Sequence, residues 1–242
     1  MILHFTLLLS LLLSGCASSR GFDRDAMNAI FQSPAGAVAE RKTAITPTEK
    51  LATPVPFRLA IYFVQRDFPA HHTIQKAQWS DADKDALSNR LTSLRSEQIV
   101  TDTFLLADST IQGSDVQKIR RAASRYGADV VMIVDGVAGV DRYNNGYAAL
   151  YATLIGAYLA PGTVSETLFI INGSLWDARA EQLYATQTAE GHAKSVGSAV
   201  MVEDSQVLAQ SKKMALEEFS KRMADELRRL KDALPRPSDR LR

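Results

Sequence analysis

The sequence predicts an α/β fold: a mixed β-sheet of about five strands flanked by helices, with a long C-terminal amphipathic helix. Three observations lead to this prediction. Strand-like runs alternate with helix-like runs from residue 57 to residue 137, two later strand-like runs flank a short polar turn, and the last long run carries one continuous apolar face. The expected order is strand, helix, strand, helix, strand, an inserted segment, strand, strand, helix.

The first half of the domain alternates between strand and helix. The run 57–64 is aromatic and branched and directly follows Pro56, which is typical of a strand. Ser80 and Asp83 form an S-x-x-D signal for the start of a helix, and leucines at spacings of four and three then follow on one face. A second strand is predicted over 98–106, which again holds branched and aromatic residues.

The stretch 114–137 predicts a second helix that leads directly into a third strand. Ser114 and Gln117 fit another capping box, and Gly127 suits a left-handed helix end. The run 129–137 is apolar on both faces, as expected of a strand that is covered from both sides. We therefore expect this strand in the middle of the sheet.

The last third of the chain predicts a hairpin and a covering helix. Residues 168–177 and 183–188 flank a polar turn at 178–181, and so short a loop joins antiparallel neighbours. The final helix is expected over 204–234, and Pro235 ends it. Its apolar residues recur at spacings of three and four on one face: Leu216, Phe219, Met223, Leu227, Leu230 and Leu234.

Charge and composition exclude several classes of protein. The chain has 242 residues, with 28 Lys and Arg against 27 Asp and Glu, so the net charge is +1. A nucleic-acid-binding protein carries a clustered basic excess, so we expect no nucleic-acid partner. A hydrophobic fraction of 46% excludes a disordered chain. The single cysteine excludes an intramolecular disulfide framework and a CxxC site.

The cysteine follows a short apolar run. Residues 2–13 are almost wholly apolar, but a membrane-spanning helix needs about 20 such residues, so the run matches the core of a secretory signal. It ends in Leu13-Ser14-Gly15-Cys16, which resembles the lipoprotein box of bacteria. The resemblance implies cleavage between Gly15 and Cys16, removal of the signal peptide 1–15, and lipidation of Cys16. The alternative is an uncleaved hydrophobic helix with an incidental cysteine.

Lipidation would determine where the protein lies. Two or more acyl chains on Cys16 hold a protein stably on a membrane without a transmembrane helix. Ala17 stands at a position where, by resemblance to sorted enterobacterial lipoproteins, the absence of Asp favours the outer membrane and an orientation toward the periplasm. The expected domains are a flexible tether over 16–56, which is rich in Ser and Pro, an α/β domain over 57–234, and a polar tail over 235–242.

The domain also resembles known envelope lipoproteins. The helix and strand of 114–137, the hairpin and the C-terminal helix are similar to the curli secretion lipoprotein, the lipoprotein activator of penicillin-binding proteins, and the N-terminal domain of the Tol-Pal β-propeller protein. Residues 147–162 and 174–177 resemble the uncharacterised rhombotarget (rhombotail) lipoproteins. The chain lacks the hydrophobic and basic sorting tail of many members of that family. The resemblance implies an envelope accessory or assembly role and supplies no catalytic residue.

No motif for catalysis or metal binding stands out. His71, His72 and His192 have no metal-ligand spacing, so we expect no metal and no cofactor. Asp135 and Asp141 flank the predicted end of the third strand, where ligands bind in open α/β sheets, although loop caps are the other interpretation. We expect a protein that is not an enzyme, with a cell-wall-acting enzyme as the least favoured alternative.

The segment 143–165 has no charged residue and is the candidate contact surface. Tyr143, Tyr147 and Tyr151 recur every four residues, with Leu154 and Tyr158 alongside. Tyrosine suits a boundary between water and an apolar phase, so a partner protein or the bilayer is one interpretation. The other is a helix or hairpin that packs on the domain.

Two functional hypotheses follow. The first is a lipid-anchored accessory module that binds an unknown envelope protein. The second is a subunit of a homo-oligomeric outer-membrane assembly or secretion-type complex that uses the segment 143–165.

Overall fold

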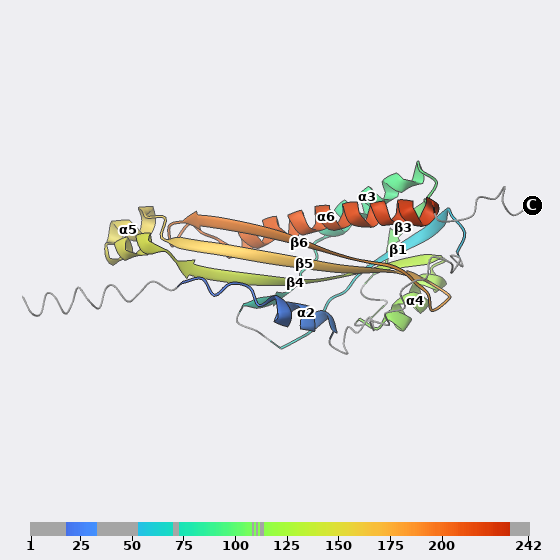
Figure 1. Ribbon diagram of the computed structural model, residues 1–242, viewed down its shortest axis with the longest axis horizontal. Helices are drawn as coiled ribbons and strands as arrows, with labels where there is room; N and C mark the ends of the chain where they lie inside the picture. Colours follow the sequence, from blue (N-terminus) through green and yellow to red (C-terminus); the bar gives the residue numbers. More distant parts are fainter. Residues whose placement is uncertain are drawn as a thin grey trace, which may run out of the picture.

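The computed structural model describes residues 18–32, 53–69, 73–107, 109, 111 and 114–232, apart from the side chains of Gln32 and Leu154. This part forms an elongated α/β domain in which one mixed sheet carries helices on both faces, which confirms the predicted fold class (Figure 1). Gly15, Cys16, the His71-His72 pair and the tail 235–242 lie outside the described residues.

Helices and strands follow the predicted order, with short additions at 74–76, at 93–95 and inside the insertion. A further helix lies near residues 25–31, where the sequence allows a short one. The elements in chain order are α2 (Arg24–Gln32), β1 (Phe57–Phe63), β2 (Ile74–Lys76), α3 (Asp81–Thr92), η2 (Ser93–Arg95), β3 (Val100–Leu105), α4 (Val116–Arg125), β4 (Val130–Asn144), η4 (Gly146–Ala152), α5 (Leu154–Leu159), β5 (Thr163–Asp177), β6 (Leu183–Gly197) and α6 (Asp204–Asp232).

The sheet has six strands, and three of them are long. The order is β3-β1-β4-β5-β6, with β1 parallel to both β3 and β4, and with β5 antiparallel to β4 and β6. Strands β4, β5 and β6 have 15 residues each, which corresponds to about 50 Å. The short strand β2 pairs antiparallel with β4 beyond the end of β1. It was not predicted, because three residues with two exposed side chains give no periodicity.

Strands β4 and β5 extend further than the sequence predicts. The predicted strand 129–137 continues to Asn144, which pairs with Thr163 at the start of β5. Asp135 and Asp141 therefore lie inside a strand, and the prediction that they flank its end is wrong. Polar and small side chains fill the added strand ends, so the hydrophobic pattern that marks a strand is missing there. The insertion is the loop of a long hairpin.

Helices cover both faces of the sheet. Helices α3 and α6 lie on one face, where Phe219 and Met223 of α6 are fully buried in the main core (Figure 1). Helices α4 and α2 lie on the opposite face, where Ile119 and Met27 are fully buried. The apolar stripe of α6 is confirmed as far as Leu227, with Leu230 packed at its margin.

Helix ends follow the predicted capping signals with one exception. Ser80 and Asp83 form the complete capping box of α3. Helix α4 is capped by Asp115, whose carboxylate accepts hydrogen bonds from the backbone of Gln117 and Lys118, so the prediction that Ser114 is the cap is wrong. Carboxylate oxygens are strong acceptors at this position. Gly127 follows α4 with φ 79°, as predicted.

The segment after Cys16 is attached to the domain over its described part. The prediction of a flexible tether over 16–56 does not hold for residues 18–32, because α2 packs against β4 and Met27 is fully buried. The hydrophobic face of this helix is short, with Met27 and Phe31 spaced by four, so composition alone suggested a linker. Val55 and Thr53 also lie against the domain at its other end.

Candidate functional site

The loop between β4 and β5 folds into two short helical turns at one end of the molecule (Figure 1). Asn145 caps η4 by accepting a hydrogen bond from the backbone of Tyr147 at 2.9 Å. Thr153 caps α5 in the same way, with its hydroxyl 3.0 Å from the backbone nitrogen of Gly156. Local side chains thus satisfy the first amide groups of each turn.

Close backbone packing holds these two turns together. A Cβ atom at Gly156 would lie 1.8 Å from the carbonyl oxygen of Leu150, so only glycine lets α5 approach η4 so closely. Tyr151 points inward, with its hydroxyl 2.9 Å from the hydroxyl of Thr163 at the start of β5. The loop is therefore an ordered extension of the hairpin.

The same loop exposes a set of large apolar side chains. Their exposed fractions range from 51% to 75% for Tyr147, Leu150, Ile155, Tyr158 and Leu159. Val200 and Met201, in the connection from β6 to α6, are 57% and 77% exposed at the same end of the sheet. We call these seven residues the apolar tip. Large apolar surfaces of this kind mark contact sites, because soluble proteins bury most such groups.

The predicted contact residues separate into groups. Tyr147 and Tyr158 belong to the apolar tip, whereas Tyr151 is half-buried and supports it from within. Tyr143 lies on β4 directly behind the tip, is not one of its seven residues, and donates a hydrogen bond to Glu166. The spacing of four residues suggested that Tyr143, Tyr147 and Tyr151 share one helix face. Tyr143 instead belongs to strand β4, which ends at Asn144 before the tip begins. The sequence places Ile155 alongside the tyrosines, whereas Leu159 and Met201 were missed. Leu159 lies in the uncharged stretch, which was a usable signal, but Met201 reaches the tip only through the fold.

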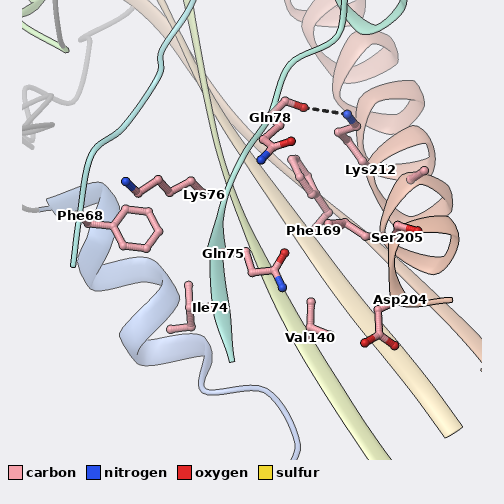
Figure 2. A pocket seen from close by; sticks show the side chains of 12 residues that line it. Phe68, Ile74, Gln75, Lys76, Gln78, Val140, Phe169, Asp204, Ser205 and Lys212 are labelled. Atoms are coloured by element: carbon pink, nitrogen blue, oxygen red, sulfur yellow. Dashed lines mark hydrogen bonds between the residues drawn. The ribbon is translucent and has the colours of Figure 1, made fainter. Parts of the chain in front are cut away.

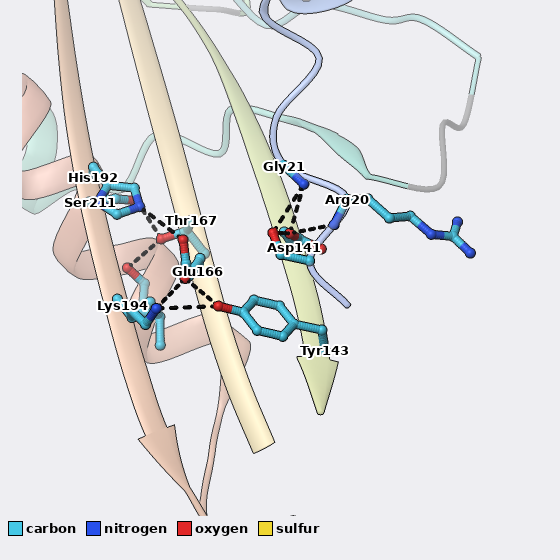
Figure 3. Close-up of polar contacts among 11 residues, drawn as sticks. Arg20, Gly21, Asp141, Tyr143, Glu166, Thr167, His192, Lys194 and Ser211 are labelled. Carbon is cyan, nitrogen blue, oxygen red and sulfur yellow. Dashed lines mark hydrogen bonds and ion pairs between the residues drawn. The ribbon is translucent and has the colours of Figure 1, made fainter. Parts of the chain in front are cut away.

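A polar network covers the sheet beside Tyr143 (Figure 3). Glu166 of β5 accepts a hydrogen bond from the Tyr143 hydroxyl at 2.7 Å and pairs with Lys194 of β6 at 2.5 Å. His192 lies 3.4 Å from the same carboxylate. The hydrogen bonds from Lys194 and Tyr143 lower the pKa of Glu166, and the bond to Glu166 raises the pKa of Tyr143. These cross-strand contacts have a structural explanation and show no free nucleophile or base.

Asp141 binds the chain just after Cys16 (Figure 3). One carboxylate oxygen accepts hydrogen bonds from the Ser19 hydroxyl at 2.6 Å and from the backbone nitrogens of Arg20 and Gly21 at 3.1 and 3.0 Å. Asp141 is buried, so this cluster replaces its lost hydration. The sequence could not show this role, since the partners lie about 120 positions away.

Asp135, the other predicted carboxylate, has a separate partner. Its carboxylate pairs with the Arg66 guanidinium at 2.5 Å, and both side chains are almost fully buried. Burial raises the pKa of Asp135, against the opposing effect of Arg66. Asp135 and Asp141 are six positions apart on one strand, a distance of about 20 Å, so they do not form a catalytic pair.

A groove of about 700 Å³ lies between β2 and the start of α6 (Figure 2). Its floor is apolar and includes Phe169 and Val140. The charged groups at its rim are already paired: Lys212 with Asp83 at 2.6 Å, Asp204 with Arg142 at 2.9 Å, and Lys76 with Asp67. The groove therefore offers an apolar surface without an uncompensated charge for a ligand.

The described residues show neither a cluster of metal ligands nor a membrane-spanning helix. No three His, Cys, Asp or Glu side chains gather there in an arrangement that could hold a metal ion. No helix in the described ranges is long and apolar enough to cross a membrane.

Comparisons with known proteins find only distant structural similarity. No protein-family model and no curated protein matches the chain. A neuraminyllactose-binding hemagglutinin homologue from Helicobacter pylori is 12% identical, over 74% of this chain and 90% of that one, with a TM-score of 0.39. PelC from Paraburkholderia phytofirmans, a dodecamer, is 14% identical over 72% and 91%, with a TM-score of 0.31. Lipoprotein GNA1162 from Neisseria meningitidis is 11% identical over 69% and 99%, with a TM-score of 0.30.

These TM-scores lie below 0.5, so we draw no functional argument from them. The resemblance to the rhombotarget lipoproteins stays a prediction.

Proposed function

We propose that this chain is a lipid-anchored protein of the bacterial envelope, attached to the outer membrane through acyl chains on Cys16. It acts in the periplasm as a non-enzymatic accessory module that binds another envelope protein. The observation that carries this proposal is the lipoprotein box at Leu13–Cys16 followed closely by a segment that is bonded to the domain. The anchor and the folded domain are thereby joined by a very short connection.

The side-chain chemistry of the domain supports a binding role. The two buried carboxylates singled out in the sequence, Asp135 and Asp141, lie on different parts of β4, and each is held by structural partners. The buried Asp177 likewise accepts hydrogen bonds from Thr53 and Tyr184. Glu166 and His192 belong to cross-strand contacts. The apolar tip and the apolar groove, by contrast, are surfaces without a polar reaction centre.

Replacement of Cys16 tests the proposed anchor. The full chain and its Cys16→Ser variant would be expressed in a Gram-negative host, and the membranes would be washed with high salt and carbonate. We expect the unchanged chain to stay in the membrane fraction with the intact mass of an acylated, cleaved protein. We expect the variant to lose that mass and to leave the membrane. Equal retention of both chains, with an unmodified cysteine, would contradict the proposal.

An oligomeric assembly is the second candidate. Strand β6 is a sheet edge of 15 residues, and β5 is its one strand neighbour within the described sheet. A long edge is a template for pairing with another chain, although Glu190 and Lys194 place charge along it. Light scattering of the detergent-extracted protein tests this candidate. A monomer at micromolar concentration would eliminate it and leave the accessory role intact.

A further inference from the structure

We infer that the apolar tip enters the interfacial layer of the same bilayer that holds the Cys16 acyl chains. The long strands then stand roughly perpendicular to the membrane surface. This inference rests on the proposed lipidation of Cys16 and adds a second membrane contact, made by the fold itself.

The position of the anchor is the first step. Ser19 is bonded to Asp141, which lies three positions before the end of β4, about 10 Å along the strand. Cys16 precedes Ser19 by three positions, and three residues span at most about 11 Å. The acyl chains must therefore emerge near the end of the molecule that carries the tip. Figure 1 shows the described N-terminal residues at that end, whereas α6 ends at the opposite one.

The chemistry of the tip is the second step. The segment 143–165 has no charged residue, so entry into a headgroup layer costs no ionic desolvation. Ile155 and Leu159 supply aliphatic surface, and Tyr147 and Tyr158 supply rings with a polar hydroxyl. Tyrosine is enriched where proteins cross the boundary between lipid and water.

The size of the tip sets how deeply it enters. Helix α5 has six residues and is about 9 Å long, whereas the hydrocarbon core of a bilayer is about 30 Å thick. Interfacial helices reach about 5–10 Å into the headgroup and acyl boundary. The tip therefore reaches into one leaflet and does not span.

Charged side chains limit further entry. Arg142 and Lys194 lie on the strands directly behind the tip, with exposed fractions of 38% and 48%. Exposed Arg20 lies on the N-terminal segment beside them. Arg142 is paired with Asp204 and Lys194 with Glu166, so charges of both signs stand at headgroup level when the tip is inserted, and their desolvation cost stops deeper entry. The apolar tip is therefore followed along the long axis by the charged side chains of Arg142, Lys194 and Arg20, an order that suits an interfacial anchor.

The acylated cysteine allows a sharp test. Because its sulfur is held in a thioether, a cysteine introduced elsewhere becomes the one free thiol of the chain. Full-length Ile155→Cys and Tyr126→Cys variants would be purified in detergent, labelled with an environment-sensitive dye, and reconstituted into phosphatidylethanolamine–phosphatidylglycerol vesicles. Ile155 is 71% exposed on the tip, and Tyr126 is 55% exposed after α4 at the other end, so neither change alters the core.

We expect the dye at position 155 to shift to the blue and to be quenched by lipids that carry a doxyl group near the headgroup. The dye at position 126 should show neither effect. An unshifted, unquenched dye at 155 on an acylated protein would overturn the inference and leave the lipid anchor in place. A blue shift without lipid quenching would indicate a protein contact and would also overturn it. An intact mass without acyl chains would overturn the proposed function and this inference together.

Discussion

Arg66 and Asp135 form a buried ion pair that fixes α2 on the sheet. The guanidinium lies 2.5 Å from the carboxylate, and it also donates a hydrogen bond to the carbonyl oxygen of Ile30 at 2.8 Å. Ile30 belongs to the last turn of α2, where carbonyl groups lack helical partners and favour a cation. One arginine thus neutralises a buried charge of β4 and completes the end of the helix that follows the predicted lipid anchor.

The variant Arg66→Met should be strongly destabilised, because it leaves the Asp135 carboxylate buried without its cation. We expect a loss of about 3–5 kcal/mol in the free energy of unfolding, measured by urea denaturation. Burial raises the pKa of Asp135, and removal of Arg66 takes away the contact that opposes this rise. The loss should therefore shrink as the pH falls and the buried carboxyl of the variant becomes neutral.

The exposed ion pair between Arg24 of α2 and Glu190 of β6 is the matched control. Arg24→Met should cost less than about 1 kcal/mol, because both side chains are solvated. Equal losses for the two variants would show that burial of the Arg66–Asp135 pair is not what stabilises α2.

The ion pair between Lys212 and Asp83 connects α6 to the start of α3. It should make the free energy of unfolding depend on pH in the acidic range. Burial opposes ionisation of Asp83, but hydrogen bonds from Lys212 and Ser80 outweigh it and lower the pKa of Asp83 below 3.8. A lowered pKa means that the folded state binds this proton less tightly, so the stabilisation is present above the ordinary pKa and is lost as the pH falls through the lowered one.

Lys212→Met should therefore lower stability at pH 7 by about 1–3 kcal/mol and reduce the loss of stability on acidification. Urea denaturation between pH 7 and pH 3 measures both effects. The neighbouring exposed Lys213 gives the control, and Lys213→Met should leave the pH profile unchanged. If both variants keep the profile of the unchanged chain, the Lys212–Asp83 pair is not the acid-sensitive contact.

Gly191 allows α6 to cross β6 in close contact. A Cβ atom there would lie 2.0 Å from the carbonyl oxygen of Ser211 and 2.5 Å from the backbone nitrogen of Ala215. Both atoms belong to the helix backbone, which cannot rotate away, so Gly191→Ala should cost about 3 kcal/mol or more and lower the melting temperature by roughly 6–12 °C.

On the same strand, a Cβ atom at Gly197 would meet only the end of the Val202 side chain, at 3.0 Å. Gly197→Ala should therefore change the melting temperature little. Similar shifts for the two alanine variants in calorimetry would contradict the assignment of the cost to the helix backbone.

Sequence patterns predicted some of these elements and could not predict others. The stripe of α6 and the run of β1 were predictable, because a continuous apolar face leaves a period in the sequence. The outer half of β4 was not, since Asp141 faces the N-terminal segment and Arg142 binds carbonyl groups of the β6–α6 connection. Their partners lie far along the chain, and no local spacing encodes them.

The candidate site was predictable in outline for a related reason. The absence of charge over 143–165 singled out the tip, but the spacing of Tyr143, Tyr147 and Tyr151 suggested one helix face. The strand, the inward-pointing Tyr151 and the close approach at Gly156 follow from pairing and packing that only the fold supplies.

Gly156 should be essential for the shape of the tip and dispensable for the domain. An added Cβ would fall 1.8 Å from the Leu150 carbonyl oxygen, so Gly156→Ala must push α5 away from η4. Because the tip lies beyond the last pair of β4 and β5, we expect little change in the melting temperature of the domain. We expect faster chymotrypsin cleavage at Tyr147 and Tyr158, read by mass spectrometry, because local opening exposes the backbone. Gly146→Ala is the control, since a Cβ there meets no atom within 4 Å. Equal cleavage rates for both variants would mean that the Gly156–Leu150 contact does not hold the tip together.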